Sequence, residues 1–149
     1  MALLSRRLMR KPLAELPVYL KSREFTVAVT ALLDRPAFLR DRKHRDQISE
    51  AVDSILANMS EGYEQSSDAG LAKYLYTSKG STAEVVTRLT SAKRRGWITA
   101  DELRPCAEMG EEIGRMLGGW IKYLARCDWK DRGRHWAGNS GRESISDCD

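Results

Sequence analysis

The stretch TADELRPCAEMGEEIGRMLGGWIKYLARC, residues 99–127, decides the fold class of this chain. It opens with a capping box, in which the Thr99 hydroxyl and the Glu102 carboxylate each accept a hydrogen bond from a free backbone N–H. At about 100° per residue, two apolar stripes follow on one helix, displaced from each other by about 80°. The first contains Leu103, Cys106, Gly110, Ile113, Leu117, Ile121 and Leu124, and the second contains Met109, Met116, Trp120, Tyr123 and Cys127. The stretch therefore predicts one long helix with a wide apolar surface.

Three further helical patterns precede this stretch, separated by turn signals. Their expected bounds are roughly residues 14–34, 42–63 and 68–95. Apolar residues recur in them at three- and four-residue steps, and no stretch alternates with the period of two that marks a strand. The third pattern ends in Lys93-Arg94-Arg95-Gly96, where the cations complement the helix dipole and Gly96 supplies a left-handed cap. Because short connections favour antiparallel neighbours, the sequence predicts an all-α, up-down-up-down four-helix bundle.

The second stripe of residues 99–127 indicates a contact with another subunit, because a helix with one partner surface needs a single stripe. The predicted oligomer interface consists of Met109, Met116, Trp120 and Tyr123. The alternative is a wide core face, which bundle helices often have. Gly110, Gly114 and Gly118 each cost on the order of 1 kcal/mol relative to alanine in a helix interior. We expect close helix approach along their edge to offset that cost.

The composition indicates one domain, since 42% of the 149 residues are hydrophobic, enough for a continuous core. We expect a flexible basic segment over residues 1–13, the bundle over 14–126 and a disordered tail over 127–149, which lacks helical periodicity. No run of about 18 apolar residues exists. The basic residues near the start follow the short apolar patch there, an order unlike that of a signal peptide. A cytoplasmic location with no membrane contact is expected.

Positive charge is unevenly spread along this chain of pI 9.1. Residues 1–45 hold eleven basic and four acidic side chains, whereas residues 46–149 hold fourteen and seventeen. In the expected topology, the connection after the first helix shares one end of the bundle with the connection after the third. The cations gathered there are Arg40, Arg42, Lys43, Arg45, Lys93, Arg94 and Arg95.

These seven cations are the predicted nucleic-acid-binding residues. Clustered Lys and Arg among a few acids suit a polyanion, because neutralising phosphates releases counterions. The alternative is a solvated charged surface that keeps a protein-interaction module soluble.

The sequence offers no support for catalysis or metal binding. It contains no nucleophile elbow, Cys/His constellation, paired-carboxylate arrangement or phosphate loop. Cys106, Cys127 and Cys148 form no Cys-x-x-Cys pair, and neither His44 nor His135 belongs to a Glu-x-x-His motif. We therefore expect a non-enzymatic protein with no catalytic residue, no metal site and no cofactor.

Several motifs resemble a known family. They are LPVY at residues 16–19, SILANMSEGY at 54–63, YLYTSKGSTAE at 74–84 and GWI at 96–98. They are similar to the bacterial four helix bundle proteins encoded in intervening sequences of large-subunit ribosomal RNA genes. The positions that match this family's pattern are Asn58, Glu61, Gly62, Lys79, Gly80, Ser81 and Glu84. The chain departs from it at Ser49-Glu50, where the family often has a basic pair, and at Leu56, where the family often has proline.

The segment EIGRMLGGWI, residues 112–121, looks more like the related accessory variability determinant of diversity-generating retroelements. That relative is known as a basic pentameric barrel that associates with a reverse transcriptase and nucleic acid. The resemblance implies a homopentamer but does not determine its partner. The expected partners are nucleic acid, as ribosomal RNA, another RNA or RNA/DNA, and a reverse transcriptase. The predicted function is an oligomeric nucleic-acid-binding adaptor, and the alternative is a structural protein–protein interaction module without nucleic-acid binding.

Overall fold

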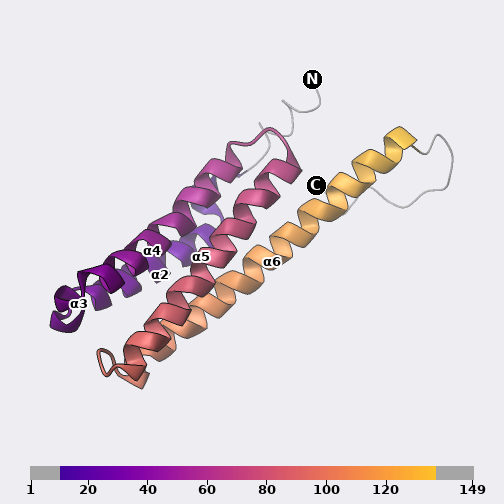
Figure 1. Ribbon diagram of the computed structural model, residues 1–149. Coiled ribbons are helices and arrows are strands. Elements are labelled where there is room, and N and C mark those ends of the chain that lie inside the picture. The colour runs from indigo at the N-terminus through magenta and orange to yellow at the C-terminus, as the bar shows by residue number, and fades with distance from the viewer. Residues whose placement is uncertain (1–10, 137–149) are drawn as a thin grey trace.

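The computed structural model describes residues 11–136, with side-chain surroundings as far as Arg126 (Figure 1). Every regular element in this part of the chain is a helix, which confirms the predicted all-α class there. The elements are the 3-10 helix η1 (Leu13–Glu15) and the α-helices α2 (Pro17–Leu33), α3 (Pro36–Arg40), α4 (Arg42–Tyr63), α5 (Asp68–Arg94) and α6 (Ala100–Trp136). Among these helices, none is both long and apolar enough to cross a membrane.

The helix starts follow local sequence signals. Pro17 and Pro36 each occupy the beginning of a helix, where the missing proline N–H removes no helical hydrogen bond. The α4 helix starts after Asp41, whose Oδ1 accepts a hydrogen bond from the backbone N–H of His44 at 3.0 Å. The Asp41 carboxylate thus replaces a hydrogen bond that the first turn of α4 cannot make internally.

The predicted boundary between the last two long helices is confirmed in detail. The Thr99 N–H donates to Glu102 Oε2 at 2.8 Å, and the Glu102 N–H donates to Thr99 Oγ1 at 3.2 Å. Gly96 has a φ of 75°, the left-handed conformation expected of a residue that ends a helix. The connection from α5 to α6 is therefore determined by its own residues.

Two predicted boundaries differ from the structure. The expected helix over 14–34 is divided, because Leu13–Glu15 form a 3-10 turn and α2 begins only at Pro17. The expected tail begins too early, since α6 continues to Trp136. Once a helix is nucleated, each further residue adds one hydrogen bond, so a helix can outlast the apolar pattern that anchors it. The rest of the expected tail, 137–149, and residues 1–10 of the expected flexible segment lie outside the described residues.

The long helices share one hydrophobic core. Both α2 and α5 pack against α4 and α6, and Figure 1 shows α4, α5 and α6 lying side by side along most of their lengths. Large side chains fully enclosed in this core include Phe25, Ile48, Ile55, Met59, Leu75, Leu89, Ile113 and Leu117. A buried hydroxyl also joins two helices, because Ser78 Oγ donates to the Ile55 carbonyl at 2.8 Å.

The first predicted stripe of α6 faces this core, and one of the three glycines there permits close packing. A Cβ added at Gly110 would lie 2.5 Å from Val86 Cγ2, whereas one added at Gly114 would meet nothing within 4 Å. At Gly118 the nearest atom is Nζ of the flexible Lys79 side chain, at 3.3 Å. The expected close approach is therefore found at Gly110 alone.

Replacing these glycines by alanine is expected to have opposite effects. Gly110→Ala drives a methyl group into the stiff Val86 side chain and lowers the free energy of unfolding by about 1–3 kcal/mol. Gly114→Ala removes a flexible residue without a clash and raises the free energy of unfolding by up to about 1 kcal/mol. Urea denaturation followed by circular dichroism measures both values. Equal destabilisation by the two substitutions would contradict this packing.

Candidate nucleic-acid interface

Two connections that are distant in sequence meet at one end of the molecule. Arg95, just after α5, lies 3.5 Å from Asp41, just before α4, although 54 residues separate them. Arg35, just after α2, pairs with Glu102 in the first turn of α6. We refer to residues 34–46 and 93–102 together as the connector end. The two groups of cations that are predicted to share an end of the molecule are thus brought together by the structure.

An aromatic cluster holds the connector end together. The Phe38 and Trp97 rings meet edge to face with centroids 5.4 Å apart, and the His44 ring lies 5.3 Å from Trp97 and 6.4 Å from Phe38. Phe38 is fully enclosed and His44 is buried. The Arg95 guanidinium lies over the Trp97 ring, 5.0 Å from its centroid. Each such aromatic pair adds about 0.5–1.5 kcal/mol beyond its buried area.

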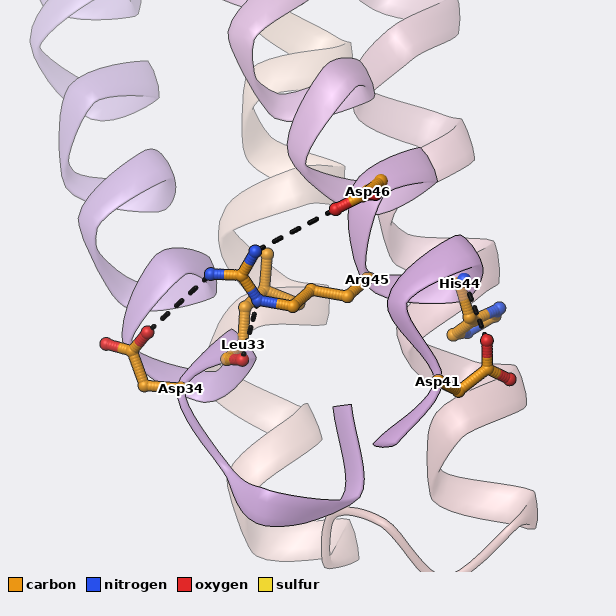
Figure 2. A network of polar contacts seen from close by, with 6 residues as sticks. All are labelled: Leu33, Asp34, Asp41, His44, Arg45 and Asp46. Atoms are coloured by element: carbon orange, nitrogen blue, oxygen red, sulfur yellow. Dashed lines mark hydrogen bonds and ion pairs between the residues drawn. The ribbon is translucent and has the colours of Figure 1, made fainter. Parts of the chain in front are cut away.

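Arg45 is occupied by contacts within the chain. Figure 2 shows its guanidinium reaching from α4 to the end of α2, where Nε donates to the Leu33 carbonyl at 3.3 Å. The same guanidinium lies 3.9 Å from Asp34 and 3.8 Å from Asp46. Because Leu33 and Asp34 close α2, this contact positions the connection between α2 and α4.

The seven predicted cations therefore divide into two sets. Arg45 and Arg95 pair with acids of the same chain and hold the connector end in place. The other five are exposed and make no ion pair with any described residue; they are Arg40, Arg42, Lys43, Lys93 and Arg94. We call these five the free cations. Their binding of nucleic acid stays a prediction.

The α3 helix and the aromatic cluster are not predicted by the sequence pattern. Turn signals predict only a break between helices over residues 35–41, yet Phe38 in this segment is fully buried and Leu39 is 53% exposed. The available signal was the apolar run Ala37-Phe38-Leu39 directly after a proline that can start a helix. Because Phe38 within it and His44 just after it are buried, the connection between α2 and α4 is more rigid than a polar loop.

The chemistry of the buried titratable side chains fits a structural role. His44 Nε2 is enclosed and has no hydrogen-bond partner among the described residues. Within that part of the chain, no three His, Cys, Asp or Glu side chains are grouped so that they could hold a metal ion. Burial raises the pKa of the Cys106 thiol above its ordinary value, so the thiol stays protonated at neutral pH and is a weak nucleophile.

Several residues of the family-like motifs join α4 to α5, away from the connector end. Asn58 donates to the Ser54 carbonyl at 2.8 Å, and the Ser54 hydroxyl lies 2.9 Å from that of Ser81. Tyr74 donates to Glu61 at 2.9 Å, and this hydrogen bond to a carboxylate raises the pKa of the Tyr74 hydroxyl. These motif residues are explained by helix packing.

Gly62 and Glu84, two further matching positions, also have structural contacts. A Cβ added at Gly62 would lie 2.7 Å from the Tyr74 Cβ, so only glycine allows α4 and α5 to approach this closely. Glu84 pairs with Arg88 at 2.8 Å, at the i,i+4 spacing that brings opposite charges together on a helix surface. Arg88 Nη1 also donates to the side chain of Gln47 on α4 at 2.8 Å.

The predicted oligomer interface on α6 is partly covered within one chain. Met109, Met116, Trp120 and Tyr123 are half-buried and pack against the core of their own chain. The Trp120 ring meets the Tyr63 ring edge to face with centroids 6.1 Å apart. The wide-core-face alternative accounts for these contacts, and a subunit contact through the same residues stays a prediction.

Comparison with known proteins places these features in a family context. The sequence model described as "23S rRNA-intervening sequence protein" matches residues 14–119. A crystal structure of a protein of unknown function from the S23 ribosomal protein family of Bacteroides thetaiotaomicron is similar, with a TM-score of 0.63 and 26% sequence identity. The match covers 70% of this chain and 95% of that chain. No curated protein matches the chain.

Two substitutions in the aromatic cluster are expected to distinguish the stability that ring packing contributes from the effect of the buried His44 nitrogens. Trp97→Ala removes the ring that contacts Phe38, His44 and Arg95 and lowers the free energy of unfolding by about 2–4 kcal/mol. His44→Phe keeps a ring and removes a buried nitrogen without a partner, so stability is expected to stay equal or to rise. Thermal and urea denaturation measure both. A loss of more than about 1 kcal/mol in His44→Phe would show that the histidine nitrogens contribute stabilising interactions.

Proposed function

Because the chain belongs to the 23S rRNA-intervening sequence protein family, we propose that it is a non-enzymatic nucleic-acid-binding adaptor whose connector end contacts structured RNA. The observation that carries this proposal is that the five free cations lie together at the connector end. They lie at the end of α3, at the start of α4 and at the end of α5, which the Arg95–Asp41 and Arg35–Glu102 pairs hold together.

The pairing pattern supports a polyanionic partner. A Lys or Arg already engaged by a carboxylate gains less from a phosphate than an unpaired one, because the phosphate must compete with the acid. Free cations instead exchange their bound counterions for phosphates, and the released ions favour binding at low salt. Since the aromatic cluster orders the connector end beforehand, little conformational entropy is lost when RNA binds.

The surroundings of the cations favour recognition of backbone and shape over the reading of bases. Trp97 is half-buried, with Arg95 over its ring, and Phe38 is enclosed. These rings are therefore poor platforms for stacking an unpaired base. Contacts from Lys and Arg to phosphates position a nucleic acid but carry no sequence information. A folded RNA with closely spaced phosphates suits such a surface.

The proposal includes the assembly that the family resemblance implies. We propose that the long helices form an antiparallel, up-down-up-down four-helix bundle, and that copies assemble into a cytoplasmic homopentamer. The packing of α2 and α5 on the same two helices supports the bundle. A ring of copies would present the free cations repeatedly and increase avidity without a new type of contact. Ribosomal RNA or a reverse transcriptase with its nucleic acid is the proposed partner.

Removing free cations is expected to weaken RNA binding. The triple variant Arg42→Gln, Lys93→Gln and Arg94→Gln loses three of them. Its affinity for a fluorescein-labelled RNA stem-loop should fall, and the slope of log affinity against log salt should shrink by about one for each cation removed. Fluorescence anisotropy between about 50 and about 200 mM salt measures both quantities.

A matched control carries the same loss of charge elsewhere. Lys73→Gln, Arg115→Gln and Lys122→Gln replace three exposed cations on α5 and α6, outside the connector end. This control should retain most of the wild-type affinity and slope. Equal losses in the two triple variants would show that only net charge matters. Absence of binding at about 50 mM salt would refute the proposed function and favour the protein–protein interaction module.

A further inference from the structure

Large apolar side chains are exposed on two helices away from the connector end. In the described part of the chain, Leu20 is 43% exposed and Val27 is 71% exposed, both on α2, and Tyr76 on α5 is 62% exposed. Leu39 at the connector end is the fourth such side chain. Covering exposed apolar surface is favourable by roughly 25 cal/mol per Å². These residues therefore indicate surfaces that gain from contact with a partner.

The exposed residues of α2 lie on one face, opposite the core. Leu20 and Val27 are two turns apart, and Ala31 continues their line one turn further. Val18, Phe25 and Val29 point into the core from the other side of the helix. We call the side with Leu20, Val27 and Ala31 the outer face of α2.

The outer side of α5 carries mostly small, uncharged side chains. Tyr76, Gly80, Ala83 and Thr87 are exposed and follow one another at three- and four-residue steps. None of these four exposed residues carries a charge. We call this side the outer face of α5. Its small residues leave room for the larger side chains of another helix.

The two outer faces point in opposite directions. Both α2 and α5 pack against α4 and α6, so they lie across the core from each other. Two different faces on opposite sides of a subunit form a heterologous contact that joins each copy to the next. Such a row closes into a ring where the contact lies towards one side of both faces, so that successive copies are rotated.

The axial positions of the two faces also match. Both helices end at the connector end, so they run in the same direction. A Cβ added at Gly110 would lie near both Phe25 and Val86, which places these two residues at the same height. Counting from that height, Leu20 is level with the segment from Gly80 to Ala83, and Val27 is level with Thr87. Leu20 of one face thus opposes the small residues Gly80 and Ala83 of the other.

Charged residues beside the two faces are complementary. Positions around each helix axis are counted in the direction of the chain, at about 100° per residue. On this count, Arg23 lies about 60° before the centre of the α2 face, and Glu84 lies about 70° past the centre of the α5 face. When two parallel helices face each other, a residue rotated to before the centre of one face lies on the same side of the contact as a residue rotated past the centre of the other. Arg23 and Glu84 therefore lie on the same side. Arg23 and Glu84 are also at the same height in the register above.

We propose that a second copy of this chain covers these surfaces, with the outer face of α2 in one copy packed against the outer face of α5 in the next. This inference rests on the proposed self-association and names its surface. It differs from the sequence-based interface on α6, whose apolar side chains already pack against their own core. Arg23 lies beside Glu84 of the next copy at the edge of the contact, where the Glu84 carboxylate can bind it together with Arg88 of its own chain.

Complementation between two defective copies tests this arrangement. Val27→Glu damages the α2 face, and Ala83→Glu damages the α5 face; both positions are exposed, and circular dichroism checks that each variant folds. By size-exclusion chromatography with light scattering, each variant alone should be monomeric. An equimolar mixture should form a dimer with one copy of each variant, because one intact face of each kind remains.

Charge exchange tests the register. Arg23→Glu and Glu84→Arg should each raise the dissociation constant about three- to tenfold, and the double variant should recover most of that loss. The control Asp53→Arg changes an exposed acid on α4 and should leave assembly unchanged. Failure of the double variant to recover would overturn the proposed register.

The remaining outcomes separate this inference from the broader proposal. A wild-type chain that is monomeric at micromolar concentration would refute self-association itself. A wild-type oligomer that survives Val27→Glu and Ala83→Glu but dissociates in Trp120→Glu would place the contact on α6 and overturn only the named faces. A mixture of the two defective variants that stays monomeric would exclude the heterologous pairing.

Discussion

Burial of the apolar sides of α2, α4, α5 and α6 against one another is the constraint on which the other features depend. It requires glycine at Gly62 and Gly110, where the neighbouring side chains leave no room for a methyl group. It also determines where the helices end, and so which connections meet. The Arg95–Asp41 and Arg35–Glu102 pairs form only because the core has already brought those connections together.

The connector end shows how packing decides which charges are available. Each of Arg45 and Arg95 has an acid of its own chain nearby, and both serve to hold helix ends in place. The five free cations have no such partner among the described residues. A count of basic residues treats all seven alike, whereas the pairing separates the two that stabilise the end from the five that can meet an anion.

The residues that carry the family resemblance and the residues proposed to bind RNA are largely different. Asn58, Glu61, Gly62 and Ser81 are explained by contacts within α4 or between α4 and α5. The resemblance therefore reports mainly on the packing of these two helices. This division explains why family membership indicates the fold more directly than the function.

The sequence by itself determined the helical class, the Thr99–Glu102 capping box, the left-handed Gly96 and the Glu84–Arg88 pair. Each of these depends on residues at most four apart, whose geometry a helix sets without help from the rest of the chain. Only the tertiary structure decided that Phe38 packs on Trp97, that Arg95 is paired and Lys93 is free, and that the outer faces of α2 and α5 point apart. Those outcomes depend on the rotation and axial register of helices far apart in sequence, and periodicity alone leaves both undetermined.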